Sequence, residues 1–331
     1  MQKSEVPMKI KDTDYLYATM RVRANEKNLL TERDISRMCD AKTASEAAKI
    51  LSDAGYGDVA GGSFSDVSAA IVRMREKTGK LIDEICENRA IFDVFALKYD
   101  FHNIKTVIKA SLSGSDAERL LSDSGTVSKE DIISAYRTGD VSALPEKMGK
   151  AFLEARDILS RTGDACLADI ALDRAYFEML ITAAESSESE FLRGYVSLLA
   201  DIANLRTAVR AARQGRDDDI LRRALVPGGK LRTDALLVRD FTGACASSPL
   251  RAAAELGEIA AKNNGTLLEF ERALDLAGIE YMKAARYVAF DERPIIAYIA
   301  AREAEEMTVR IIMAGKAEGL SADEIKSRLR V

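Results

Sequence analysis

Few side chains in this sequence have the types and spacing that catalysis or metal binding requires. The only histidine is His102, which nearly excludes a catalytic triad or a histidine-rich metal site. No nucleophile motif lies near His102. We therefore expect it to have a structural role, partly buried and hydrogen-bonded on a helix.

The segment Gly228-Gly229-Lys230 resembles part of a phosphate-binding loop but departs from that pattern. Position 224 is Ala where the pattern needs Gly, and Leu231 stands where Ser or Thr would contact magnesium. The preceding Pro227 favours a simple turn. The sequence therefore predicts no nucleotide-binding loop, and nothing else in it indicates a cofactor.

Acidic and sulfur side chains offer two further possibilities for metal binding, and both are weak. The glutamates Glu303, Glu305 and Glu306 lack the Glu-x-x-His partners of carboxylate metal centres, so a solvated helix face plus one repeat-motif carboxylate is favoured. The cysteines form no Cys-x-x-Cys pair, which predicts reduced thiols rather than a disulfide framework or a zinc site. They are Cys39, Cys86, Cys166 and Cys245.

The strongest internal signal is a motif that returns about every hundred residues. Its first copy is Asp100-x-x-Asn103-Ile104-Lys105-Thr106 and its second is Asp201-x-x-Asn204-Leu205-Arg206-Thr207, an offset of 201 − 100 = 101. A weaker third copy, Glu305-x-x-Thr308-Val309-Arg310, follows after 305 − 201 = 104 residues. A glycine stands nine positions after each basic residue, at Gly114, Gly215 and Gly319. The repetition predicts one module built three times.

The spacing within the motif predicts what its residues do. The first and fourth positions lie on one helical face, whereas the basic residue points about 180° away from the carboxylate. Because the pattern recurs in three modules, we expect a shared packing role that fixes how the helix meets its neighbours. The residues with this role are Asp100, Asn103, Lys105, Asp201, Asn204, Arg206, Glu305, Thr308 and Arg310. A second pair supports the period: Ala171-Leu172-Asp173 and Ala273-Leu274-Asp275 are 273 − 171 = 102 residues apart.

A basic stripe begins inside the second copy of the motif. Arg206, Arg210 and Arg213 are spaced i, i+4 and i+7, and the stripe ends at Arg216. Such stripes are usually solvated, and the alternative is an electrostatic contact with acidic groups on a partner. The whole chain has 48 basic and 53 acidic residues and a net charge of −5, which argues against a nucleic-acid-binding protein.

Composition and periodicity predict an all-α fold. The chain has five prolines and no tryptophan, good helix formers dominate, and no segment alternates strictly between polar and apolar residues. The repeat places three modules at residues 1–114, 115–215 and 216–331, the first with a loose tail over residues 1–13. An apolar stripe from Val67 to Tyr99 predicts a long helical seam with a break near Asn88 and Arg89.

Short capped helices are predicted at three places. A hydroxyl at the N-cap and a carboxylate three residues later form the capping-box pattern. The three pairs are Thr31 with Asp34, Ser128 with Asp131, and Ser321 with Glu324. The segment from Leu231 to Leu236 keeps only the apolar frame of this pattern.

The motif also carries a family resemblance. Tyr99-Asp100-Phe101-His102-Asn103-Ile104-Lys105 resembles the "YDYHNLK" signature of the C subunit of the archaeal and bacterial A/V-type ATPases, whose counterpart in the eukaryotic vacuolar enzyme is the d subunit. The segment from Tyr15 to Ala24 resembles the opening helix of the family. The end of the chain is also similar, from Pro294 through Arg310 to Arg330. The resemblance spans roughly residues 14 to 331.

This resemblance implies three modules around a pseudo-threefold axis, forming a funnel. It implies a central-stalk protein whose wide mouth receives the D and F subunits of the central shaft, and whose other side sits on the membrane rotor ring. The protein would transmit torque for ATP-linked proton or sodium transport and catalyse nothing, because the nucleotide pockets of the family belong to other subunits. It would be cytoplasmic and peripheral on the membrane.

Hydropathy agrees with a peripheral location. The longest uninterrupted apolar run, Ile295 to Ala301, is far shorter than the roughly 20 residues of a membrane span. No apolar stretch follows a basic start, so we expect no signal peptide.

Two other classes of function stay open at this point. One is a free-standing α-helical repeat scaffold or adaptor, although solenoid repeats are usually about 20–50 residues long. The other is a helical enzyme that uses Asp or Glu with Lys, which would need a pocket where carboxylate pKa values are displaced.

Overall fold

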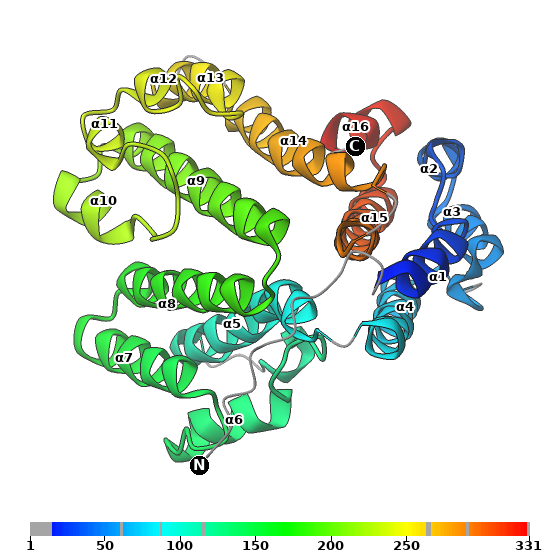
Figure 1. Ribbon diagram of the computed structural model, residues 1–331, viewed down its shortest axis with the longest axis horizontal. Coiled ribbons are helices and arrows are strands. Elements are labelled where there is room, and N and C mark those ends of the chain that lie inside the picture. The colour runs from blue at the N-terminus through cyan, green and yellow to red at the C-terminus, as the bar shows by residue number, and fades with distance from the viewer. Residues whose placement is uncertain are drawn as a thin grey trace, which may run out of the picture. The chain divides into compact units, whose positions relative to one another are not determined.

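The computed structural model describes residues 15–59, 62–86, 88–113, 117–262, 266–288 and 291–329, and these residues contain helices and no strand (Figure 1). The all-α prediction is confirmed. The predicted tail over residues 1–13 and the glycine at position 114 lie outside the described residues. The chain divides into two compact units, one formed by residues 1–87 and 281–331 and the other by residues 88–280.

The first unit is built from both ends of the chain. In Figure 1 its blue N-terminal helices lie beside its red C-terminal ones. Its N-terminal elements are α1 (Leu16–Glu26), α2 (Glu32–Asp40), α3 (Ala44–Leu51), a π-helix (Ser52–Tyr56) and α4 (Phe64–Ile85). Its C-terminal elements are α15 (Arg293–Ala317) and α16 (Ala322–Arg328). One apolar core joins them, with Met38, Leu51 and Ile71 from the N-terminal part and Ile312 and Ile325 from the C-terminal part.

The second unit begins with helices that pack around α8. It starts with α5 (Ala90–Ser113), a short 3-10 helix (Glu118–Leu120), α6 (Lys129–Thr138), α7 (Glu146–Thr162), α8 (Ala165–Ser186) and α9 (Glu190–Arg213). Helix α8 contacts α5, α7 and α9 (Figure 1). Shorter elements follow: α10 (Asp218–Ala224), α11 (Thr233–Leu237), α12 (Phe241–Ala244) and α13 (Arg251–Ala261). Helix α14 (Leu267–Ala285) begins in this unit and ends in the other.

The three motif copies lie on the three helices α5, α9 and α15, which have 24, 24 and 25 residues. Helix α4 ends at Ile85 and α5 begins at Ala90, so the predicted break near Asn88 is confirmed. The long apolar run begins inside α15, where Ile295, Ile296 and Ile299 are buried. Among the described residues, no helix combines the length and the apolar character that crossing a membrane requires.

The three predicted capping pairs each stand at the start of a short helix, and two of them form the complete box. At the start of α2, Thr31 and Asp34 exchange both hydrogen bonds of the box, and Ser321 and Glu324 do the same at α16. At α6, the Ser128 hydroxyl accepts from the Asp131 amide at 3.1 Å and donates to its carboxylate at 2.6 Å. Helix α11 has no side-chain cap, as its sequence indicated. The division into three modules, the pseudo-threefold axis and the funnel stay predictions.

Candidate functional site: the repeated helix motif

The carboxylate of the first motif copy holds the chain where it enters α6. Asp100 is fully buried. Its Oδ2 accepts hydrogen bonds from the Thr126 amide at 3.0 Å and the Thr126 hydroxyl at 2.7 Å, and its Oδ1 accepts from the Val127 amide at 3.0 Å. Asn103 lies one turn along the same face and pairs with the backbone of Ser122, donating to its carbonyl and accepting from its amide, both at 2.8 Å.

The second copy repeats this arrangement with different loop residues. The Oδ1 atom of Asp201 accepts from the amides of Lys230 at 2.7 Å and Leu231 at 2.9 Å. Asn204 pairs with both backbone groups of Val226, at 2.9 Å to the carbonyl and 2.7 Å from the amide. In each copy, therefore, two polar side chains on one helical face bind the backbone of the segment that returns across it.

This arrangement explains the segment that superficially resembled a phosphate loop. The amides after Gly229 do point at an anion, and that anion is the Asp201 carboxylate of the same chain. A Cβ atom on Gly229 would collide with Asp201 Oδ1, and one on Gly125 would collide with Asp100 Oδ1. Glycine is needed at both positions because the carboxylate approaches the backbone too closely for any side chain.

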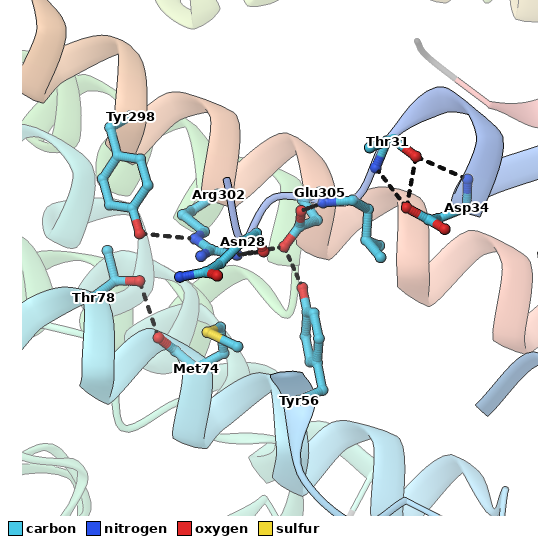
Figure 2. Close-up of polar contacts among 10 residues, drawn as sticks. Asn28, Thr31, Asp34, Tyr56, Met74, Thr78, Tyr298, Arg302 and Glu305 are labelled. Carbon is cyan, nitrogen blue, oxygen red and sulfur yellow. Dashed lines mark hydrogen bonds and ion pairs between the residues drawn. The ribbon is translucent and has the colours of Figure 1, made fainter. Parts of the chain in front are cut away.

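The third copy keeps the carboxylate but changes its donors (Figure 2). Glu305 accepts from the amide of Leu30, from the Tyr56 hydroxyl at 2.5 Å and from the Arg302 guanidinium at 2.8 Å. Thr308 does not act as the asparagines do, because its short hydroxyl donates to the Ala304 carbonyl of its own helix at 2.8 Å. The weaker sequence match thus corresponds to a real difference in bonding.

Burial sets the electrostatics of the two aspartates. Burial raises the pKa of Asp100 and of Asp201 above the ordinary value of 3.8, and the backbone N–H bonds oppose this rise. The amides therefore offset part of the cost of placing a carboxylate out of water. They do not remove it.

The basic residue of the motif lies on the other side of the helix. There it forms an ion pair with a long helix later in the chain. Lys105 of α5 pairs with Asp173 of α8 at 2.5 Å, and Lys109 pairs with Asp169 at 2.6 Å. From the first pair to the second, the base moves four residues forward on α5 and the acid moves four residues back on α8. This is the pattern of antiparallel helices joined by a ladder of ion pairs.

The same ladder recurs between α9 and α14 in the second copy. Arg206 pairs with Glu271 at 2.7 Å and with Asp275 at 3.5 Å, and Arg210 pairs with Glu271 at 2.7 Å. The bases are shifted by 206 − 105 = 101 and the acids by 275 − 173 = 102 residues relative to the first ladder. The repeat therefore includes the contact between the motif helix and a later helix as well as the motif.

In the third copy the positions of acid and base are exchanged between the two helices. Arg310 pairs with Glu306 of its own helix at 3.1 Å. Glu306 in turn receives Arg75 from α4. The acid now lies on the motif helix and the base on its partner. Glu305 and Glu306 are thus each paired with arginine and both are buried, so the expected solvated face was wrong for Glu306. Within the described ranges no group of three acidic, histidine or cysteine side chains is placed to hold a metal ion.

The basic stripe, for which a partner contact was the alternative to a solvated face, has contacts within the chain. Arg206 and Arg210 bind acids of α14, and the Arg213 guanidinium donates to the Ala260 carbonyl at 3.0 Å. Arg216 is exposed and donates to the Gln214 side chain at 3.3 Å. That these four residues contact a partner stays a prediction, and Arg216 is the one least engaged in packing among them.

The prediction for His102 was partly wrong. Its ring Nε2 lies 3.2 Å from the Leu120 carbonyl, so the expected hydrogen bond is present, but the side chain is exposed. Two residues correspond to about 200° around a helix, which turns His102 away from the buried face of Asp100. The four cysteines are free thiols, with only Cys166 exposed.

Sequence reasoning missed several partners of the motif. The acids of the two ladders carried a readable signal, because bases at i and i+4 on one helix faced acids at the same spacing on another. Tyr56, Arg302 and Arg75 carried none, since they serve only the third copy and have no equivalents at the repeat period.

A glycine substitution tests the close approach in the second copy. We expect Gly229→Ala to lower the free energy of unfolding by about 1–3 kcal/mol, because the new Cβ displaces the Asp201 carboxylate. The control is Gly278→Ala in α14, where a Cβ would meet only Ile202 at 3.9 Å and should add roughly 0.5–1 kcal/mol of stability. Urea unfolding measures both, and equal effects would contradict the close approach.

Stability against pH tests the buried aspartates. Because the pKa of Asp201 is raised in the folded state, its protonated form favours folding, and this contribution is lost as pH rises through the folded pKa. Asp201→Asn removes the titration. The free energy of unfolding of the wild type, minus that of the variant, should therefore fall between pH values below 3.8 and neutrality. A constant or rising difference would show that burial does not govern this group.

A double-mutant cycle tests the first ladder. Lys105→Glu should lower stability by about 0.5–1 kcal/mol, a modest value because Lys105 and Asp173 are 25% and 44% exposed. Adding Asp173→Lys restores opposite charges and should recover at least half of the loss. Additive losses in the double variant would mean that the pair does not interact in solution.

Comparisons with known proteins cover nearly the whole chain. Residues 18–328 match the family model described as "ATP synthase (C/AC39) subunit". The A-type ATP synthase C subunit of Haloquadratum walsbyi is 26% identical over 96% of this chain and 99% of its own length. The V-type sodium ATPase C subunit of Enterococcus hirae is 22% identical over 93% of this chain and 96% of its own length. The V-type ATP synthase C subunit of Thermus thermophilus is 29% identical over 62% of this chain and 66% of its own length. From the span of the family match, the chain belongs to the ATP synthase (C/AC39) subunit family.

Proposed function

We propose that this chain is the central-stalk subunit of a rotary V/A-type ATPase and couples a shaft made of the D and F subunits to the membrane rotor ring. In this role it passes torque between ATP-linked rotation and the transport of protons or sodium ions, and it lies on the cytoplasmic face of the membrane. The observation that carries the proposal is the similarity to proteins named as C subunits of A-type and V-type enzymes, over almost the full length of both chains.

The bonding of the motif supports a non-catalytic role. Asp100 and Asp201 are carboxylates with raised pKa values, as an enzyme using acidic groups would need. Each is nevertheless buried and accepts hydrogen bonds from two backbone amides of a packed segment. Their polar capacity is used for packing, which favours a mechanical part over an enzyme.

Stiffness is the property that torque transmission requires, and the ladders supply it between long helices. Helices α5 and α8 are tied at two rungs, and α9 and α14 are tied by Arg206 and Arg210. Pairs of this kind contribute little stability when exposed, but they fix the register of two helices. A pseudo-threefold funnel of three such modules is the arrangement we propose for the assembled protein.

Reconstitution tests the proposal. The purified chain is mixed with a complex of the D and F subunits, and separately with membranes that contain the rotor ring, and binding is measured by co-elution and co-sedimentation. We expect binding to both and no ATP hydrolysis by the chain alone. Binding to neither, or ATP hydrolysis by the purified chain, would contradict the proposed role.

The contact prediction is tested in the same assay with Arg216→Glu, which leaves the α9–α14 ladder intact. If Arg216 meets acidic groups on a partner, its reversal should weaken binding about tenfold. The matched control is Arg251→Glu, an arginine on α13 that is 69% exposed and pairs within its own helix with Glu255. Equal binding of the two variants would remove Arg216 from the interface without affecting the coupling role.

A further inference from the structure

Helix α2 is held at both of its ends by a helix that follows it by more than 250 residues. At its start, the Leu30 amide donates to the Glu305 carboxylate, across 305 − 30 = 275 positions. At its end, the Lys316 ammonium donates to the Cys39 carbonyl at 2.5 Å. Both Glu305 and Lys316 belong to α15.

The spacing of these two contacts matches the length of the helix between them. Glu305 and Lys316 are 316 − 305 = 11 residues apart, or about 16 Å along α15, and the 9 residues of α2 span about 14 Å. Helix α15 therefore contacts α2 near its start and near its end. A single substitution on α15 would release only one end.

The charges suit the two ends of α2. The acid meets the helix start, where backbone amides carry partial positive charge, and the base meets one of the last four carbonyls, which lack partners within the helix. Helix α16 adds Lys326 on Asp40 at 2.7 Å. Of these groups, Lys316 supplies a donor to a helix-end carbonyl, whereas Lys326 and Asp40 form an exposed ion pair.

The contact at the start of α2 belongs to a buried polar network (Figure 2). The Arg302 and Glu305 side chains are only 8% and 5% exposed and lie 2.8 Å apart. Arg302 also donates to the Asn28 carbonyl at 3.2 Å, and Tyr56 donates to Glu305. Removing the negative charge would leave a buried guanidinium without its counter-charge, which is a large penalty for so small a change.

The equivalent helices in the other unit are held differently. The helix α6 follows the carboxylate that holds it, Asp100, by less than thirty positions, because the Val127 contact spans 127 − 100 = 27. Helix α11 follows Asp201 similarly. Of these three helices, only α2 precedes its carboxylate in the chain, so α2 alone among them depends on a segment made much later.

We propose that α15 is a closing clamp for the N-terminal helices, so that α2 keeps its native structure only while Glu305 and Lys316 hold both of its ends. Releasing either end opens the segment around α2 as a local unit, while residues 88–280 stay folded. Proteins open locally in units of different stability, and α2, which adds only Met38 and Cys39 to the buried core, is a small unit of this kind. The inference does not rest on the proposed role in a rotary ATPase.

Native-state proteolysis of the full-length chain tests the clamp. Trypsin cleavage after Arg37 in α2, which is 53% exposed, reports opening of α2, and cleavage after Arg137 in α6, which is 69% exposed, reports opening of the matched helix. Cleavage rates follow the population of the open form when opening and closing are fast. Mass spectrometry distinguishes the two products.

We expect Glu305→Gln and Lys316→Met each to raise cleavage after Arg37 about tenfold, because each leaves a buried polar group unpaired. Cleavage after Arg137 should change by less than about twofold. Tyr56→Phe removes one hydroxyl from the network and provides a milder variant, with a rise of about threefold. The control is Met307→Ala, on an exposed position of α15, which should leave both rates unchanged.

Two outcomes would overturn the clamp. If cleavage rises equally after Arg37 and Arg137, the substitutions unfold the whole chain and no local clamp exists. If Glu305→Gln, Lys316→Met and Tyr56→Phe all leave cleavage after Arg37 at the rate of Met307→Ala, the contacts of α15 do not hold α2.

Discussion

The structure depends on carboxylates that leave water on the inner faces of long helices and must find hydrogen-bond donors there. Asp100 and Asp201 find them in the backbone amides of a returning loop, and Glu305 finds one amide and two side chains. An unsatisfied buried carboxylate would cost more than any single packing contact contributes. The position of each returning loop is therefore fixed by the carboxylate to which its amides donate hydrogen bonds.

The opposite side of the same helices is used for a second purpose. The basic residue of the motif lies about 140° around the helix from the carboxylate and reaches an acid on a long helix later in the chain, at Asp173 in one copy and Asp275 in the other. One short sequence motif thus sets two interfaces, one to the loop before the short helix of its own repeat and one to a long helix later in the chain. This double use explains why carboxylate and base are repeated together.

The sequence was sufficient to predict the helical class, the repeat period, the break before α5 and the capped helices, because each depends on residues near one another in the chain. The partners of the motif were harder. The loop that binds Asp201 resembled an incomplete phosphate loop. Its anion could not be recognised from the sequence, because it is a side chain 29 positions earlier. The bases Arg206 and Arg210 looked free because their acids lie on another helix. Tyr56 and Leu30 meet Glu305 only after the two ends of the chain come together.

The most direct measurement of the central claim is amide hydrogen exchange at Leu30, Val127 and Leu231, resolved residue by residue by nuclear magnetic resonance. All three amides precede a short helix and donate to a motif carboxylate. The account predicts that they exchange as slowly as interior amides of α5, α9 and α15, although none lies within a helix. Exchange at the rate of exposed loop amides would show that the carboxylates do not hold the returning chain.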